Sequence, residues 1–169
     1  DKVGICLTLH LKVPCGSTLT VDMNTWLSCY DNSVQPNSIL GVGMIPVGTA
    51  TGEEWVRSGF RTSINDGVQF YQSFNMMTMA VVRTVTVRQG GSTIRSSKTR
   101  TSLTTGKILL TLSRDTEGNS RLVFRHNGED IVVERPKEKN ETDLQLYFNT
   151  LGWPDNYTYI RFNGVSLRP

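Results

Sequence analysis

The chain has 169 residues, of which 37% are hydrophobic and 20% charged, and its net charge at pH 7 is +3. A chain of this length can bury a hydrophobic core without stabilising disulfides or metals, and the composition excludes an intrinsically disordered chain. The mild charge argues against nucleic acid as a partner. No apolar run reaches the length of a membrane span. We therefore predict one globular domain over residues 1–169, either cut from a longer chain or freed of a signal peptide.

Period-two alternation of apolar residues predicts strands throughout the first half of the chain. The segments are residues 5–13, stopped by Pro14 and Gly16, and then residues 19–23, 39–45, 68–71 and 80–87. Gly41 and Gly43 leave one face of their strand nearly bare, which suits close approach by another backbone. Asn65-Asp66-Gly67 has the composition of a hairpin turn.

A basic segment follows at residues 83–107, rich in Ser and Thr and without an acidic residue. Its cations are Arg83, Arg88, Arg95, Lys98, Arg100 and Lys107. One interpretation is a basic hairpin or arm that meets phosphate, sulfated glycan or an acidic peptide, with Arg95, Lys98 and Arg100 as candidate ligand-binding residues. The alternative is a solvated, mobile hairpin tip. No aromatic residue interleaves with these charges, so stacking of nucleic-acid bases is not supported.

Residues 107–162 contain short strands in close succession, which we interpret as an antiparallel β-meander. Residues 114–119 provide one turn, and His126-Asn127-Gly128 provides a second with the signature of a type I′ hairpin. Residues 135–143 form a polar loop, residues 151–156 turn the chain again, and Asn163-Gly164 ends the last strand. Since no window shows helical periodicity, the predicted fold class is all-β: an antiparallel two-sheet β-sandwich, jelly-roll or concanavalin-like.

Motifs of catalysis are absent from the sequence. Neither His10 nor His126 has a nucleophile placed beside it, and no zinc-binding spacing, nucleophile elbow or phosphate loop occurs. We therefore predict no enzyme, no metal site and no cofactor. Candidate ligand-binding aromatics are Trp153, in a Gly-Trp-Pro turn, and Tyr157 and Tyr159 beside it.

Three cysteines, Cys6, Cys15 and Cys29, cannot all pair with one another. They are either buried and reduced in a cytoplasmic protein, or one disulfide and one free thiol in a secreted one. Two glycosylation sequons, at Asn140 and Asn156, favour the secreted alternative.

Three patches of sequence resemble a Neuralized homology repeat, a relative of the SPRY-type concanavalin-like sandwich. They are Gly41-Val42-Gly43, the run Trp55-Val56-Arg57-Ser58-Gly59 with Asn65-Asp66-Gly67, and residues 121–130 with strands at 144–149 and 157–162. Residues 76–105, longer and more basic, replace the family's usual joining strand. The resemblance implies a protein-recognition module of the kind found in ubiquitin-ligase pathways, with its ligand bound by loops at one end.

The predicted function is a non-catalytic protein- or peptide-recognition domain in the cytoplasm. The alternative is an extracellular or viral β-sandwich, at the virion surface in the viral case, that binds a glycan or a receptor. The presence or absence of glycans at Asn140 and Asn156 separates the two.

Overall fold

The computed structural model describes residues 5–27, 38–47, 65–75, 80–101, 105–126, 128–138, 143–152 and 158–169. This part of the chain forms strands and no helix. The strands are β1 (Ile5–Val13), β2 (Thr18–Leu27), β3 (Ser38–Pro46), β4 (Gly67–Asn75), β5 (Ala80–Gln89), β6 (Ser92–Thr101), β7 (Thr105–Arg114), β8 (Ser120–His126), β9 (Glu129–Arg135), β10 (Leu144–Gly152) and β11 (Thr158–Arg168).

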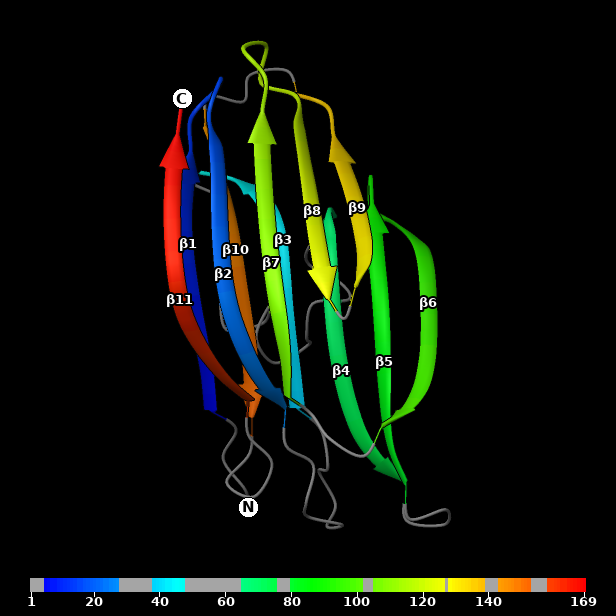
Figure 1. The fold of residues 1–169 in the computed structure, drawn as a ribbon. Helices are drawn as coiled ribbons and strands as arrows, with labels where there is room; N and C mark the ends of the chain where they lie inside the picture. The colour runs from blue at the N-terminus through cyan, green and yellow to red at the C-terminus, as the bar shows by residue number, and fades with distance from the viewer. Residues whose placement is uncertain are drawn as a thin grey trace.

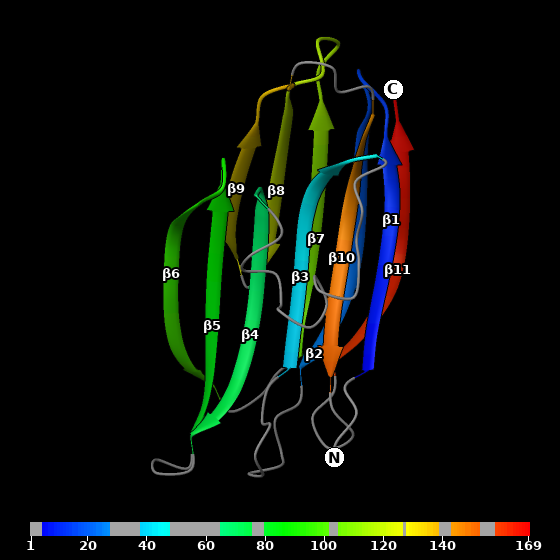
Figure 2. The same cartoon turned by 180° about the vertical axis from the view of Figure 1, so that it is seen from behind.

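The strands form two sheets that face one another as layers (Figures 1 and 2). Sheet A has six strands in the order β1-β10-β3-β4-β5-β6, and sheet B has five in the order β11-β2-β7-β8-β9. All neighbouring strands are antiparallel. The predicted all-β, antiparallel two-sheet sandwich is confirmed.

The predicted meander is wrong for its last two strands. β7, β8 and β9 are consecutive neighbours in sheet B, but β10 crosses to sheet A between β1 and β3, and β11 returns to sheet B beside β2. The alternation pattern predicts that a strand forms, but not which strand it pairs with. The predicted end of the last strand at Asn163-Gly164 is also wrong. β11 continues to Arg168 through a bulge between Phe162 and Gly164.

The core lies between the sheets, where the inward side of each strand is apolar. On β8, Leu122 and Phe124 are fully buried while Arg121 and Arg125 are exposed, as period-two alternation requires. Phe124 stacks on Phe70 of sheet A with ring centroids 5.0 Å apart, which joins the two layers. The largest buried side chains include Phe124, Phe148, Met23, Leu40, Met44, Ile108, Leu110, Leu112 and Leu122.

A corner between β1 and β2 carries the chain from sheet A to sheet B. Gly16 takes a φ of 77°, which favours glycine, and its N–H donates to the carbonyl of Asp115 at 3.0 Å. The buried guanidinium of Arg114 donates to the carbonyls of Val13 at 2.9 Å and Gly118 at 3.2 Å. This arginine therefore satisfies backbone groups from both sheets at one end of the sandwich.

Candidate functional site

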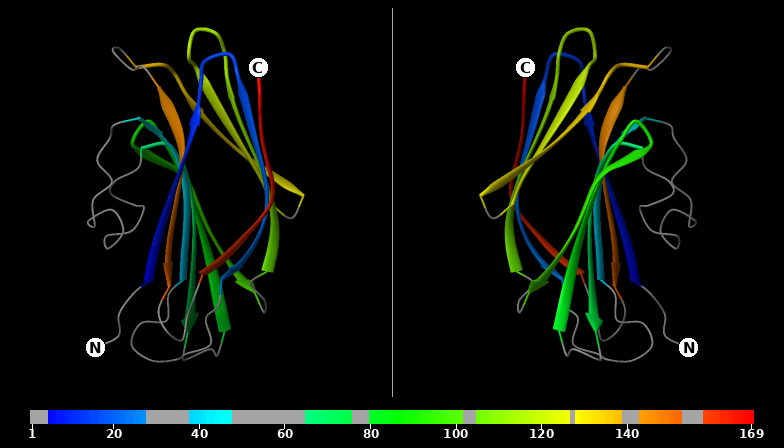
Figure 3. Two further views of the ribbon diagram at one scale, coloured as in Figure 1. Left: turned by 90° about the vertical axis from the view of Figure 1, so that its left-hand side faces the viewer. Right: turned by 90° about the vertical axis from the view of Figure 1, so that its right-hand side faces the viewer.

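The basic segment folds as a regular hairpin, β5–β6, at one edge of sheet A (Figure 3, right). Its turn is Gly90-Gly91, with φ values of 59° and 81°, as a type I′ turn requires at both central residues. The N–H of Gly90 donates to Asp66 Oδ1 at 2.8 Å, and that of Gly91 donates to the carbonyl of Asn65 at 3.0 Å. The hairpin tip is thus held by the residues that lead into β4.

The outward side of this hairpin is polar. Val85 and Val87 point to the core, so the alternating Thr84 and Thr86 lie on the opposite face. Thr86 pairs with Ser96, and Thr84 pairs with Lys98. We call these four side chains the hairpin face: Thr84, Thr86, Ser96 and Lys98.

The hairpin face presents three hydroxyls and one ammonium to solvent. Ser96 and Lys98 are exposed and the threonines are half-buried. Cross-strand neighbours lie about 5 Å apart and alternate residues about 7 Å apart, so the four groups cover roughly the area of one sugar ring. No acidic residue occurs between Ala80 and Thr101. Among the described residues, none forms an ion pair with Lys98.

The core-facing side of the hairpin connects this edge of sheet A to β9 of sheet B. Arg95, predicted as a ligand-binding residue, donates from Nη2 to Glu129 Oε1 of β9. Gln89 Oε1 accepts a hydrogen bond from the backbone N–H of Glu134 at 2.8 Å. These contacts join the edge of sheet A to β9. For Arg100 the structure describes only the backbone, which lies opposite Val82.

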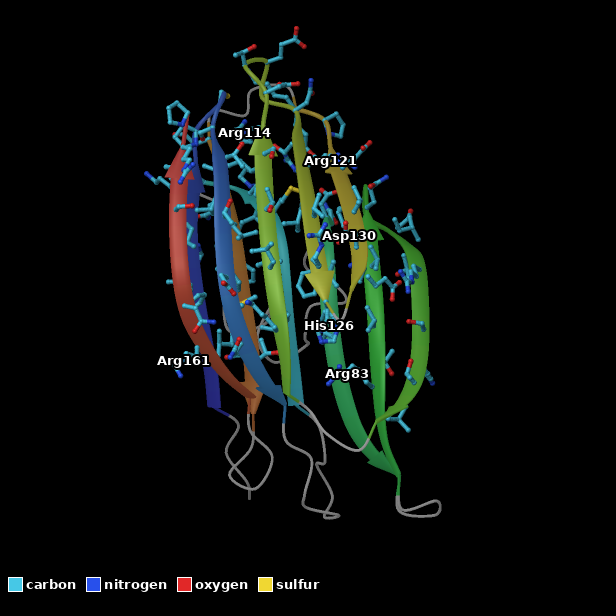
Figure 4. All side chains as sticks on the ribbon, in the orientation of Figure 1. Arg83, Arg114, Arg121, His126, Asp130 and Arg161 are labelled. Atoms are coloured by element: carbon cyan, nitrogen blue, oxygen red, sulfur yellow. The ribbon has the colours of Figure 1, made fainter. Side chains whose placement is uncertain are left out.

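A half-buried histidine, His126, lies near these contacts between the hairpin and β9. Figure 4 labels His126, at the end of β8, and Arg83, on β5, close to one another in its view. Burial, and then the charge of Arg83, lower the pKa of His126 to about 4, although Glu129 opposes the shift. Burial also lowers the pKa of Arg83. A base with a pKa of about 4 is a weak proton acceptor at neutral pH.

The His126 ring packs against neighbouring residues of both sheets. Its ring meets Phe70 edge-on with centroids 5.3 Å apart. It also packs over Gly106, where an added Cβ would lie 2.5 Å from Nε2. Glu129, the nearby carboxylate, is engaged by Arg95. Among the described residues, the neighbours of His126 in these contacts are Phe70, Gly106, Arg83 and Glu129, and none of these carries a hydroxyl or thiol nucleophile.

An open pocket of about 410 Å³ lies at the far end of sheet B, lined by Ser113, Asp115, Asn119, Ser120, Arg121, Glu134, Arg135 and Pro136. Three of its polar residues, Asp115, Asn119 and Ser120, form hydrogen bonds within the β7–β8 turn. Asp115 Oδ1 accepts from the N–H groups of Glu117 at 3.0 Å and Asn119 at 2.9 Å. Desolvation raises the pKa of Asp115, but the hydrogen bonds from Asn119, Gly118 and Glu117 together outweigh it, so the pKa is lowered. Arg121 and Glu134, exposed and 3.8 Å apart, form a loose ion pair.

The remaining predicted site residues are only partly described. Trp153, Tyr157, Asn140 and Asn156 lie outside the described residues. Tyr159 lies in β11 opposite Trp26, and only its backbone is described. Their roles stay predictions.

Two further predictions need correction. Arg135 does not begin an exposed loop, because it ends β9 with 4% of its surface exposed and its Nε lies 3.5 Å from Asp66 Oδ2. Cys15 is free but exposed, not buried, because it lies in the β1–β2 turn.

Thr84, Thr86 and Ser96 were not identified from the sequence. The signal was present in the alternation of threonine with valine over residues 84–87, which marks one core face and one hydroxyl face. Within the described ranges, no cluster of three or more His, Cys, Asp or Glu side chains is arranged to hold a metal ion. Nor do these ranges contain a helix long and apolar enough to cross a membrane.

Comparison with known proteins shows the fold alone. No protein-family model and no curated protein sequence matches the chain. Among solved structures, the carbohydrate recognition domain of Emp46p in its potassium-bound form has a TM-score of 0.54 at 8% identity, covering 96% of this chain and 77% of that one. The carbohydrate recognition domain of Emp47p has a TM-score of 0.50 at 10% identity, covering 98% and 78%.

A further match is the alginate lyase Aly36B in complex with an alginate trisaccharide. Its TM-score is 0.47 at 13% identity, covering 99% of this chain and 81% of that one. This score is too low to bear on function. The similarity to the two carbohydrate recognition domains shows that the chain shares a lectin-like β-sandwich fold.

Proposed function

We propose that the protein is a non-catalytic glycan-binding β-sandwich, and that an anionic sugar binds on the hairpin face. The observation that carries the proposal is the open array of three hydroxyls and the Lys98 ammonium, on a strand pair without an acidic residue. Hydroxyls donate to and accept from sugar hydroxyls, while the ammonium attracts a sulfate or carboxylate. The shared fold with two carbohydrate recognition domains supports a glycan ligand.

The test is a glycan array that contains neutral, sulfated and uronic-acid oligosaccharides, followed by titration of the strongest sulfated ligand. Lys98→Glu should lower affinity at least 10-fold, because a hydrogen bond to a charged group contributes about 1.5–3 kcal/mol. Thr86→Val, which keeps the shape and removes a hydroxyl, should lower it by a smaller factor. Affinity should also fall with added salt, since exposed charges are screened.

Lys107→Glu is the matched control, because Lys107 carries the same charge in sheet B and its side chain is 73% exposed. It should leave affinity within about twofold. A silent array, or a Lys98→Glu variant that binds sulfated ligand as tightly as the native chain, would contradict the proposal. Capture of a protein partner together with a silent array would instead support the peptide-recognition alternative and its candidate anchor Trp153.

A glycan ligand favours an extracellular location over the cytoplasmic one that the sequence suggested. Expression in a secretory host followed by intact-mass measurement tests this directly. We expect added glycan mass at Asn140 or Asn156, and its loss in the corresponding Asn→Gln variants. Efficient secretion without glycan at either sequon would remove the support that the sequons give.

A further inference from the structure

The two sheets have their other edge strands on one side of the molecule (Figure 1; Figure 3, left). Among the described strands, β1 pairs with β10 alone, and β11 pairs with β2 alone. Each of these two strands therefore has one row of backbone N–H and C=O groups that no other described strand pairs with. Such edges accept an additional strand unless something discourages it.

Core-facing side chains on this side are not covered. Their exposed fractions are 38% for Leu9 of β1, 40% for Phe162, 50% for Val165 and 50% for Leu167. The three β11 residues pair with residues of β2 that are at most 3% exposed: Met23, Val21 and Leu19. The apolar side of the core thus continues onto β11, where its side chains are partly exposed to solvent. We call Leu9, Phe162, Val165 and Leu167 the open side.

Phe162 connects the open side to the interior. Its ring meets Phe148 of sheet A edge-on, with centroids 5.6 Å apart. Ile160 and Leu11 are partly buried and pack against the core. An apolar side chain inserted between β1 and β11 would therefore contact surface that is continuous with the core.

The rim of the open side is basic. Lys12 of β1 and Arg161 and Arg168 of β11 are exposed, and Figure 4 shows Arg161 at the outer side of β11. The strands β1, β10 and β11 contain no acidic residue. On neighbouring β2, Asp22 is paired with Lys107 at 3.9 Å. This charge distribution favours an acidic occupant.

We propose that the open side binds an extended segment of a partner protein whose apolar residues alternate with acidic ones, added as a strand beside β11. In a strand, alternate side chains point to opposite faces. The apolar set would then cover Phe162, Val165 and Leu167, while the acidic set would meet Arg161 and Arg168. A second copy of the chain fits less well, because pairing β11 with itself brings like charges together. The hairpin face is at the opposite edge of sheet A, so this inference does not depend on glycan binding.

The test uses a fluorescein-labelled 12-residue peptide that alternates valine and glutamate, with fluorescence anisotropy as the readout. One control peptide has lysine in place of glutamate, and another has proline at every third position. We expect the acidic peptide to bind, the lysine peptide not to bind, and the proline peptide to bind at least 10-fold more weakly.

The variant Arg161→Glu/Arg168→Glu should lower affinity for the acidic peptide at least 10-fold and create affinity for the lysine peptide. Val165→Glu should also abolish acidic-peptide binding, and Lys98→Glu should leave it unchanged. Melting temperatures identify any variant that fails to fold, and each of the two β11 variants tests the inference by itself.

Three results would overturn the inference. They are no binding of the acidic peptide, equal binding of the acidic and lysine peptides, and a concentration-dependent dimer in light scattering that Val165→Glu dissociates. The last result would assign the open side to a second copy of the chain.

Discussion

Removal of the Asp66 carboxylate should destabilise the fold severely, although Asp66 lies in a short turn. Its side chain is 8% exposed and that of Arg135 is 4% exposed, with Oδ2 and Nε 3.5 Å apart. Asp66 Oδ1 also accepts from Gly90 at 2.8 Å. One carboxylate therefore connects the start of β4, the tip of the β5–β6 hairpin and the end of β9.

The magnitude follows from burial. An exposed ion pair contributes about 0–1 kcal/mol, but removal of one partner of a buried pair costs about 3–5 kcal/mol, because the other charge stays buried. Glu138 Oε1 lies 3.5 Å from Arg135 Nη2 and would retain part of the compensation. We therefore expect Asp66→Ala to lower the free energy of unfolding by about 3 kcal/mol.

Urea unfolding followed by tryptophan fluorescence measures this change. Asp130→Ala is the control, since Asp130 forms a closer ion pair with Arg125 at 2.7 Å but on the exposed face, and it should change stability far less. The double variant Asp66→Leu/Arg135→Met should be less damaging than the sum of the two single variants, because no charge remains buried alone. A loss below 1 kcal/mol for Asp66→Ala, or strict additivity in the double variant, would refute this reasoning.

Three other predictions concern stability. The pKa of His126 is lowered from 6.5 to about 4, chiefly by burial, so between these pH values the unfolded chain binds a proton that the folded chain excludes. The contribution of His126 to stability is then fully present above pH 6.5 and is lost as pH falls toward 4, by about 1–2 kcal/mol after allowance for solvent screening. In the His126→Gln variant, the midpoint of urea unfolding should no longer show this part of its dependence on pH. Gly106→Ala should destabilise by about 1–3 kcal/mol, because its Cβ would lie 2.5 Å from His126 Nε2; an unchanged thermal midpoint would mean that the ring moves freely. Gly128→Val should also cost about 1–3 kcal/mol, since Gly128 has a φ of 76°. Gly164→Val, at an ordinary φ and with no atom within 4 Å of its Cβ, should melt at a higher temperature than Gly128→Val.

The sequence by itself determined the strands and several turns, because both depend on local chemistry. Alternation of apolar residues predicted β1, β7 and β8 close to their observed bounds. The Asn-Gly pair at the β8–β9 turn predicted a positive φ, and Gly128 has one. The all-β fold class followed from these patterns together.

Only the tertiary structure decided which strands are neighbours and which charges face solvent. β10 inserts between β1 and β3, although no local pattern distinguishes that place from a continued meander. Arg95 and Lys98 looked equivalent in one basic segment, yet the strand pleat sends Arg95 to Glu129 and Lys98 to solvent. Arg114 binds a carbonyl 101 residues away. Such pairings depend on contacts between distant segments, which form only when the two sheets pack face to face.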